Sequence, residues 1–116
     1  MNIKEIEVMD THPVVKQMEK EWPIMTKEFK RLQRQQYELF LKKQHDYGPG
    51  NISVGTMLQT EDEVHLSLTG LWFRMNDKIQ RLKNMLMSKR DSAVDEPLED
   101  AYLDVSNYGI MATIVK

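Results

Sequence analysis

The turn Gly48-Pro49-Gly50 is the feature that most restricts how this chain can fold, because it separates two long helical patterns. Its glycines can adopt positive φ, and its proline cannot continue a helix. Before the turn, Trp22-Pro23 marks a start, and large side chains then recur at steps of one, three or four residues to about residue 45. The sequence therefore predicts one long amphipathic helix that ends at this turn.

A second long helix is predicted to begin at Thr60-Glu61-Asp62-Glu63. This stretch has the form of a capping box, in which the threonine accepts a hydrogen bond from an early amide and the last glutamate reaches back. Helical spacing then continues for about 28 residues. A polar run over residues 88–96 predicts a loop, and Pro97 predicts the start of a third helix. Residues 110–115 resemble a strand, but without a partner strand we expect them to end the third helix.

Three long amphipathic helices predict an all-α protein, an antiparallel helical bundle of three main helices completed by oligomerisation. Self-association is expected because three helices of this length leave apolar surface uncovered. The alternative is a plain three-helix bundle whose nine methionines fill an irregular core. Thr11-His12-Pro13 predicts a capped short helix to about Lys20. We therefore expect an N-terminal arm over residues 1–22 and a single helical domain over residues 23–116.

Composition limits the classes of function. A chain of 116 residues with 41% apolar and 29% charged residues suits one folded, helix-rich domain. It has no cysteine, which removes disulfide and thiolate metal sites and fits a reducing, cytoplasmic location. No segment approaches the roughly 20 apolar residues that span a bilayer, so we expect no membrane contact. A net charge of −2 gives no general attraction to nucleic acid, and the small cluster Lys83, Lys89 and Arg90 is better explained as a solvated helix end.

Acidic residues at helical spacing form the first candidate site. Asp100 and Asp104 lie four residues apart, so both carboxylates point the same way on the third helix, with Glu99 near its start. Two carboxylates on one face repel each other unless a cation lies between them. If Asp77 of the second helix joins them, the three form a hard oxygen site suited to Mg²⁺ or Mn²⁺.

Basic residues of the second helix flank Asp77. Arg74, Lys78 and Arg81 occur at steps of three and four residues and would hold phosphate oxygens. The alternative is a set of salt bridges between helices, in which Lys78 and Arg81 neutralise Asp100 and Asp104.

The central turn offers groups that could contact a substrate. Tyr47 has a ring for stacking and a hydroxyl, and Asn51 can donate and accept at a base edge. Asp46 could bind a metal. The alternative is that Asp46 and Asn51 only satisfy backbone groups of the turn, and His45 is better explained as a solvated or structural histidine than as a base.

Three blocks of sequence carry a family resemblance. They are Lys43-Gln44-His45-Asp46-Tyr47-Gly48-Pro49-Gly50-Asn51, Gly70-Leu71-Trp72-Phe73-Arg74-Met75-Asn76-Asp77-Lys78-Ile79-Gln80-Arg81-Leu82, and Glu99-Asp100 with Asp104 and Tyr108. In this order they resemble the phage and bacterial nucleotide-modification-associated domain and, more distantly, the MazG-like all-α nucleoside triphosphate pyrophosphohydrolases. The resemblance covers about residues 35–114. It implies a helical, oligomeric domain acting on nucleotides, with MazG-like relatives splitting a triphosphate through acid-bound Mg²⁺.

The acids of this chain depart from the MazG-like pattern. Those enzymes carry Glu-x-x-Glu on one helix and Glu-x-x-Asp on the next. In this chain, the helix that corresponds to Glu-x-x-Glu is the second predicted one. It keeps only Asp77, with Lys78 and Arg81 beside it. On the third predicted helix, Ala101 stands where the first acid of Glu-x-x-Asp would fall. Fewer acids and more bases move the site towards direct phosphate binding.

These observations together predict a Mg²⁺- or Mn²⁺-dependent pyrophosphohydrolase. It would convert an NTP or dNTP to monophosphate and pyrophosphate in phage nucleotide-pool or DNA-modification metabolism, as a homo-oligomer (dimer or tetramer). The predicted catalytic acids are Asp77, Asp100 and Asp104, with Glu99 and Asp46 as further metal ligands. The predicted substrate-binding residues are Lys43, Tyr47, Asn51, Arg74, Lys78 and Arg81. The alternative is a non-catalytic nucleotide sensor or a helical adaptor that binds another protein.

Overall fold

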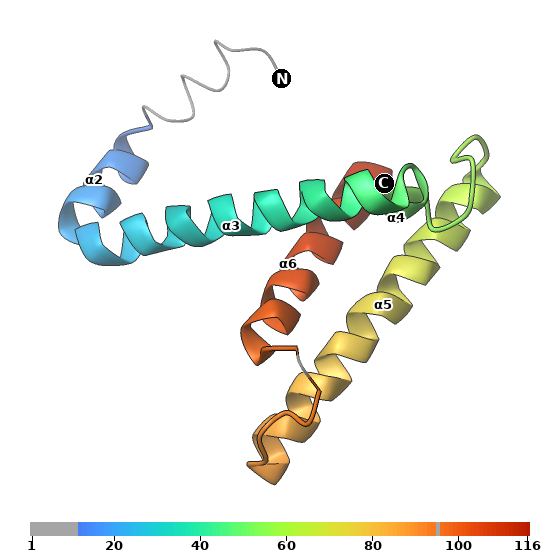
Figure 1. Ribbon diagram of the computed structural model, residues 1–116. Coiled ribbons are helices and arrows are strands. Elements are labelled where there is room, and N and C mark those ends of the chain that lie inside the picture. The colour runs from blue at the N-terminus through green and yellow to red at the C-terminus, as the bar shows by residue number, and fades with distance from the viewer. Residues whose placement is uncertain (1–11, 95) are drawn as a thin grey trace. The chain divides into compact units, whose positions relative to one another are not determined.

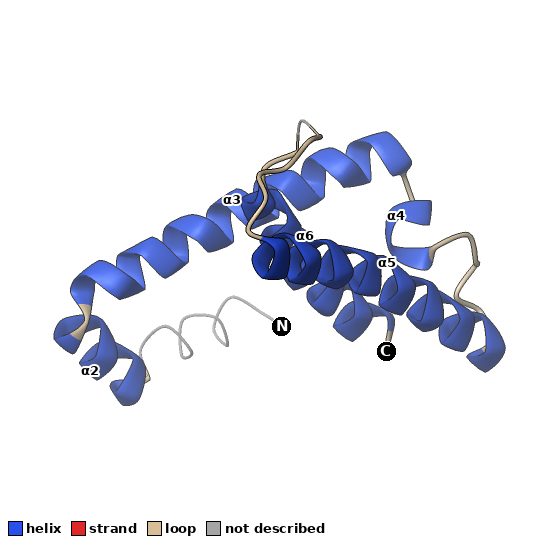
Figure 2. Ribbon diagram, turned by 90° about the horizontal axis from the view of Figure 1, so that it is seen from below, coloured by secondary structure: helices blue, strands red, loops and turns tan. Residues whose placement is uncertain are grey.

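The computed structural model describes residues 12–94 and 96–116 (Figure 1). All regular structure in these residues is helical, so the predicted all-α class is confirmed (Figure 2). The helices are α2 (Pro13–Glu21), α3 (Pro23–Tyr47), α4 (Gly50–Ser53), α5 (Glu61–Ser88) and α6 (Leu98–Val115). Residues 110–115 end α6 as a helix. None of these helices is both long and apolar enough to cross a membrane.

The ends of the helices follow the predicted signals. α3 ends at Tyr47, and Gly48 takes φ +63° so that its N–H donates to the carbonyl of Gln44 at 2.8 Å. At the start of α5, the N–H of Glu63 donates to Oγ1 of Thr60 at 3.1 Å. The carboxylate of Glu63 differs from the capping-box prediction, because it accepts from the N–H of Met57 at 2.8 Å. It therefore fixes the preceding loop as well as the helix start.

The chain divides into two compact units, Met1–Gln35 and Gln36–Lys116, with the boundary inside α3. In the first unit the described residues begin at His12, whose Nδ1 accepts from the N–H of Val14 at 3.2 Å and so caps α2. Neither α2 nor α3 contains a buried residue. The predicted arm over residues 1–22 is a shorter stretch than the first unit and stays a prediction, and its first eleven residues lie outside the described part.

The second unit contains the core. α5 and α6 run in opposite directions and pack against each other, and α4 packs on both (Figure 1). Its buried apolar side chains are Leu71, Leu82, Ala101 and Met111. The last part of α3 joins this unit through α6, because Gln36 bonds to Ser106 and Asn107, and Lys43 bonds to Asp104.

Buried polar residues are at least as numerous in this unit as buried apolar ones, and some of them tie α4 to α5. Ser67 of α5 is fully buried, and its hydroxyl donates to the carbonyl of Ser53. The hydroxyl of Thr56 lies 2.6 Å from that of Ser67. Buried polar groups must be hydrogen-bonded to avoid a large desolvation cost. These bonds therefore hold the short helix α4, which has no sequence period of its own, in one place.

Close packing at Gly70 brings the α4 end onto α5. Val54 follows α4 in the left-handed region at φ 53°, a rare conformation for a β-branched residue. A methyl group placed on Gly70 would lie 2.7 Å from Cγ1 of Val54. Gly70 therefore lets the loop after α4 approach the helix, and α5 continues through it without interruption.

Replacing Gly70 by alanine is expected to lower the free energy of unfolding by about 1 kcal/mol, the overpacking cost less the gain in helix propensity. Overpacking against Val54 typically costs about 1–3 kcal/mol, and the gain in helix propensity of about 1 kcal/mol offsets only part of it. Urea unfolding followed by circular dichroism measures the change.

Gly109→Ala is the matched control, because Gly109 is also helical and an added methyl would meet nothing within 4 Å. It is expected to raise the free energy of unfolding by about 0.5–1 kcal/mol. Adding Val54→Gly to the Gly70→Ala variant should restore stability, since it removes the clash and the left-handed strain together. Changes of the same sign at both glycines would contradict this account.

Candidate functional site

A pocket of about 220 Å³ lies in the second unit, where side chains from α3 to α6 meet. Its lining residues are Phe40, Lys43, Tyr47, Asn51, Arg74, Asp104, Asn107, Tyr108 and Met111. Cationic, amide and aromatic groups predominate among them. The structure thus brings together the predicted site residues Lys43, Tyr47, Asn51, Arg74 and Asp104.

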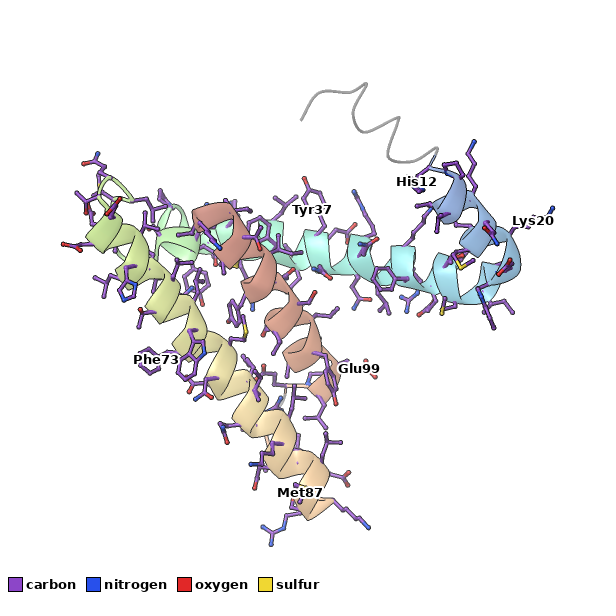
Figure 3. The ribbon with its side chains drawn as sticks, turned by 180° about the vertical axis from the view of Figure 1, so that it is seen from behind. His12, Lys20, Tyr37, Phe73, Met87 and Glu99 are labelled. Atoms are coloured by element: carbon purple, nitrogen blue, oxygen red, sulfur yellow. The ribbon has the colours of Figure 1, made fainter. Side chains whose placement is uncertain are left out.

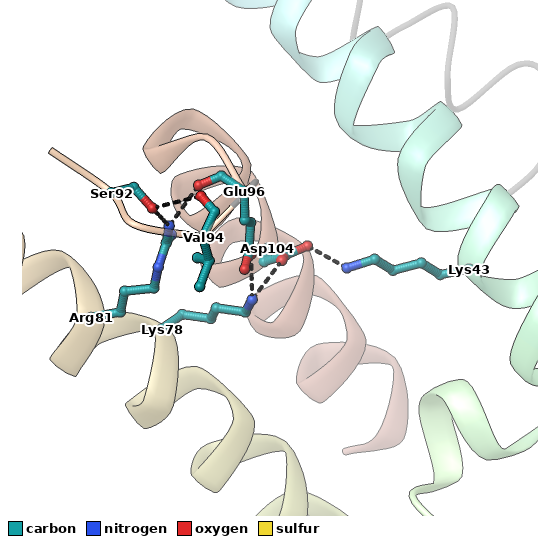
Figure 4. A network of polar contacts seen from close by, with 7 residues as sticks. All are labelled: Lys43, Lys78, Arg81, Ser92, Val94, Glu96 and Asp104. Carbon is teal, nitrogen blue, oxygen red and sulfur yellow. Dashed lines mark hydrogen bonds and ion pairs between the residues drawn. The ribbon is translucent and has the colours of Figure 1, made fainter.

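Asp104 is the acid of this pocket, and its side chain is only 5% exposed. Its Oδ1 accepts from Nζ of Lys43 at 2.6 Å, and its Oδ2 lies 3.4 Å from Nζ of Lys78 (Figure 4). A buried carboxylate is stable only when opposite charges or hydrogen bonds compensate its desolvation. Two ammonium groups, one from α3 and one from α5, provide this compensation.

A polar network continues from Lys78 into the loop before α6. Nζ of Lys78 donates to Oε1 of Glu96 at 2.7 Å. Arg81 donates from Nη2 to Oγ of Ser92 at 2.9 Å and to the carbonyl of Glu96 at 2.6 Å (Figure 4). The hydrogen bond that Lys78 donates to Glu96 raises the pKa of Lys78, and the same bond lowers the pKa of Glu96. This network fixes the loop between α5 and α6.

The salt-bridge alternative therefore describes part of what is observed. Lys78 does pair with Asp104. Arg81 instead binds a hydroxyl and a carbonyl, and its Nη1 is the one buried side-chain nitrogen or oxygen without a partner in the described residues.

A relay of amides orients Asn51. Nε2 of Gln44 donates to the carbonyl of Gly48 at 2.9 Å, and Oε1 of Gln44 accepts from Nδ2 of Asn51 at 3.1 Å. Arg74 donates from Nη1 to the backbone carbonyl of Asn51 at 3.0 Å. The left-handed Gly48 places its carbonyl within reach of Gln44. The side chain of Asn51 therefore bonds to the side chain of Gln44, not to a backbone group as the alternative expected, and Asn51 also lines the pocket.

Some lining residues were not among the predicted site residues. Asn107, Tyr108 and Met111 lie three, four and seven positions after Asp104, which is the spacing of one helix face. That spacing could have revealed them. Nδ2 of Asn107 donates to the carbonyl of Gln36 at 3.1 Å, a contact between α6 and α3 that the sequence does not indicate.

The predicted acids do not gather around Asp104. Asp77 and Glu99 are exposed, Asp100 is half-buried, and the exposed Asp46 lies 3.0 Å from Nδ1 of His45 (Figure 3 labels Glu99). Within residues 12–94 and 96–116, no group of three or more His, Cys, Asp or Glu side chains is arranged to hold a metal ion. Of the predicted metal ligands, Asp104 alone lines the pocket.

Comparison with known protein families shows which family the pocket-bearing part of the chain belongs to. Residues 43–115 match the family described as Nucleotide modification associated domain 1. The chain belongs to this family. The match confirms the predicted resemblance to a nucleotide-modification-associated domain, and it includes every pocket-lining residue except Phe40. No curated protein and no solved structure matches the chain.

The pair of Lys78 and Glu96 in this nucleotide modification associated domain predicts a pH dependence of stability. Because Lys78 lowers the pKa of Glu96, the contribution of Glu96 is present above the ordinary carboxyl value of 4.5 and is lost as the pH falls through the lowered pKa. Glu96→Gln should therefore cost about 0.5–1 kcal/mol near neutral pH. The cost should shrink as the pH falls below 4.5. Urea unfolding at several pH values measures it.

Asp77→Asn provides the control, because it removes an exposed carboxylate of α5. It should change the free energy of unfolding by less than about 0.5 kcal/mol near neutral pH. A cost of Glu96→Gln that does not vary with pH would count against the ion pair.

Proposed function

We propose that the pocket binds a nucleotide, with Lys43 and Arg74 on the phosphate oxygens and Tyr47 and Asn51 on the base or sugar. The observation that supports this most is the lining itself: two cations, two amides and several aromatic rings meet in one pocket of a nucleotide modification associated domain. Charge-assisted bonds from Lys and Arg are the usual means of holding phosphate.

Both cations keep donors for a ligand. An ammonium has three N–H donors, and Lys43 gives one to Asp104. A guanidinium has five, and Arg74 gives one to the carbonyl of Asn51. Each side chain is thus positioned by one internal bond. Lys78 adds a third positive charge through its contact with Asp104. The hydrogen bonds of Arg81 hold the loop before α6, so a phosphate-binding role for Arg81 stays a prediction.

The aromatic residues suit a base. Phe40, Tyr47 and Tyr108 line the pocket, and aromatic faces stack on bases with little regard to sequence. Tyr47 is 69% exposed and so lies at the rim. The pocket volume of about 220 Å³ is below the roughly 300–1,000 Å³ typical of ligand sites. It would therefore enclose one part of a nucleotide and leave the rest at its mouth.

A relationship to the MazG-like pyrophosphohydrolases, suggested by the three sequence blocks, would add Mg²⁺-dependent cleavage of a triphosphate. The described acids do not fit a Mg²⁺ site as they lie, because two ammonium groups occupy the carboxylate of Asp104, and Asp77 and Glu99 are exposed. Binding is thus better supported than hydrolysis. The predicted catalytic roles of Asp77, Asp100 and Asp104 remain predictions.

Self-association is a further part of the proposal. Trp72, Ile79 and Leu86 are spaced by seven residues along α5, and all three are exposed. Phe73 also projects from α5 on the side away from α6 (Figure 3). Seven-residue spacing of apolar residues is typical of helices that pair with another helix. We propose that a second copy of the chain covers this face, which would complete the predicted bundle.

Sedimentation velocity tests this association. The chain should sediment as a dimer or a larger species, and Ile79→Lys should shift it to the monomer, because a charge in an apolar contact carries a desolvation cost. Gln80→Lys, one position along the same helix and also exposed, should leave the association unchanged. A monomeric wild-type chain at all concentrations would contradict the proposal.

Nucleotide binding is tested by isothermal titration calorimetry with nucleoside triphosphates. Lys43→Met should weaken binding about tenfold or more, since a hydrogen bond to a charged group contributes about 1.5–3 kcal/mol. Lys42→Met is the matched control, because Lys42 is exposed, lies next to Lys43 on α3 and is not among the lining residues. Equal losses from both lysines would indicate only a general charge effect.

Repeating the titration in EDTA separates binding from metal-dependent catalysis. Binding that persists in EDTA supports direct phosphate contacts from Lys43 and Arg74. Binding only with Mg²⁺ or Mn²⁺, together with pyrophosphate release that Asp104→Ala abolishes, would overturn this proposal in favour of the predicted pyrophosphohydrolase. The absence of binding to any of the nucleotides would favour the protein-binding adaptor.

A further inference from the structure

Two buried asparagines line the pocket, and the side-chain nitrogen of each donates a hydrogen bond to another group of the protein. Asn51 is 5% exposed and Asn107 is 6% exposed. Nδ2 of Asn107 donates to the backbone carbonyl of Gln36 at 3.1 Å. A carbonyl can only accept, so this bond fixes which end of the amide faces α3. The oxygen Oδ1 of Asn107 is therefore the end that points elsewhere.

The orientation of the Asn51 amide is fixed in a similar way, through the side chain of Gln44. The carbonyl of Gly48 can only accept, so it fixes Nε2 of Gln44 as its donor. Oε1 of Gln44 must then face Asn51, and it accepts from Nδ2 of Asn51. The relay leaves Oδ1 of Asn51 as the free end of this side chain.

Both oxygens are accessible. Among the described residues no hydrogen bond reaches Oδ1 of either asparagine, and the one buried side-chain nitrogen or oxygen without a partner there is Nη1 of Arg81. The two oxygens are therefore not sealed in the interior. Because the asparagines are otherwise buried and line the pocket, we take the pocket as the place where their oxygens meet solvent.

We infer that the pocket selects nucleotides whose base carries an amino group where its counterpart carries a carbonyl, namely cytosine over uracil or thymine and adenine over hypoxanthine. This inference rests on the proposed nucleotide binding. Two fixed acceptors require donors from the ligand, and an amino group supplies two N–H bonds. Uracil, thymine and hypoxanthine present a carbonyl at a position where an amino base presents donors. A carbonyl facing Oδ1 would leave two acceptors desolvated and unpaired.

Sugar hydroxyls do not account for this selection, because they are the same in both members of each pair of nucleotides. The cations do not account for it either. Lys43 and Arg74 carry only donors, so they would favour carbonyl groups on a base. A preference for amino bases would thus point to hydrogen-bond acceptors in the lining, and the asparagine variants distinguish the Asn51 and Asn107 oxygens from those of Asp104, Tyr47 and Tyr108.

Calorimetric titration of the full chain with two matched pairs tests the inference. The first pair is dCTP and dUTP, which differ in the amino or carbonyl group at C4 and in the protonation of N3. The second is dATP and dITP, which differ in the amino or carbonyl group at C6 and in the protonation of N1. In each pair that binds, the amino member should bind about tenfold or more tightly, the usual discrimination of a well-made base contact.

Affinities within threefold across each pair, or tighter binding of the carbonyl member, would overturn this inference while leaving nucleotide binding intact. No binding by any of the four would overturn nucleotide binding and this inference together.

Variants separate recognition from folding. Asn51→Ala and Asn107→Ala should each lower the amino-to-carbonyl affinity ratio towards one, whereas a purely structural loss would weaken both members equally and keep the ratio. Gln36→Ala is the control, because it retains the backbone carbonyl that Asn107 uses and removes only the bond from Ser106. It should leave the ratio unchanged. If an alanine variant fails to fold, the wild-type pairs still decide the inference.

Discussion

The buried carboxylate of Asp104 is the interaction on which the second unit depends. It carries a negative charge in a protein interior with few buried apolar side chains, and it is compensated by Lys43 of α3 and Lys78 of α5. Removing either lysine would leave the charge poorly compensated. The pairing therefore links three helices at one point, and that point is the wall of the pocket.

Under the proposed function, the same pairing would prepare the pocket for an anion. Asp104 restricts the ammonium groups of Lys43 and Lys78, so part of the entropy of ordering them is lost during folding rather than on binding. The amide relay does the same for Asn51, since Gln44 and Gly48 fix its orientation. A nucleotide would thus meet cations and hydrogen-bond acceptors that are already in position, held by contacts inside the protein rather than by the ligand.

The helices could be predicted from the sequence, because caps, glycines and prolines act locally. Thr60, Gly48 and Pro97 each mark a helix end close to where it is observed. α4 was not predicted, because a helix of four residues is too short to show a helical repeat of apolar residues in the sequence. The site was harder, since Lys43 and Asp104 are 61 residues apart. Spacing showed that Asp100 and Asp104 share a side of α6, but it could not show that Asp104 faces α3 and α5 while Asp77 faces solvent.

The central claim is that the pocket around Asp104 is where a nucleotide binds. Nuclear magnetic resonance of the side-chain N–H groups during titration with a nucleoside triphosphate tests it most directly. The account predicts that the largest shifts occur at Nδ2 of Asn51 and Asn107 and at the guanidinium of Arg74. Shifts confined to residues 12–35 or to the exposed face of α5, with these three side chains unchanged, would contradict it.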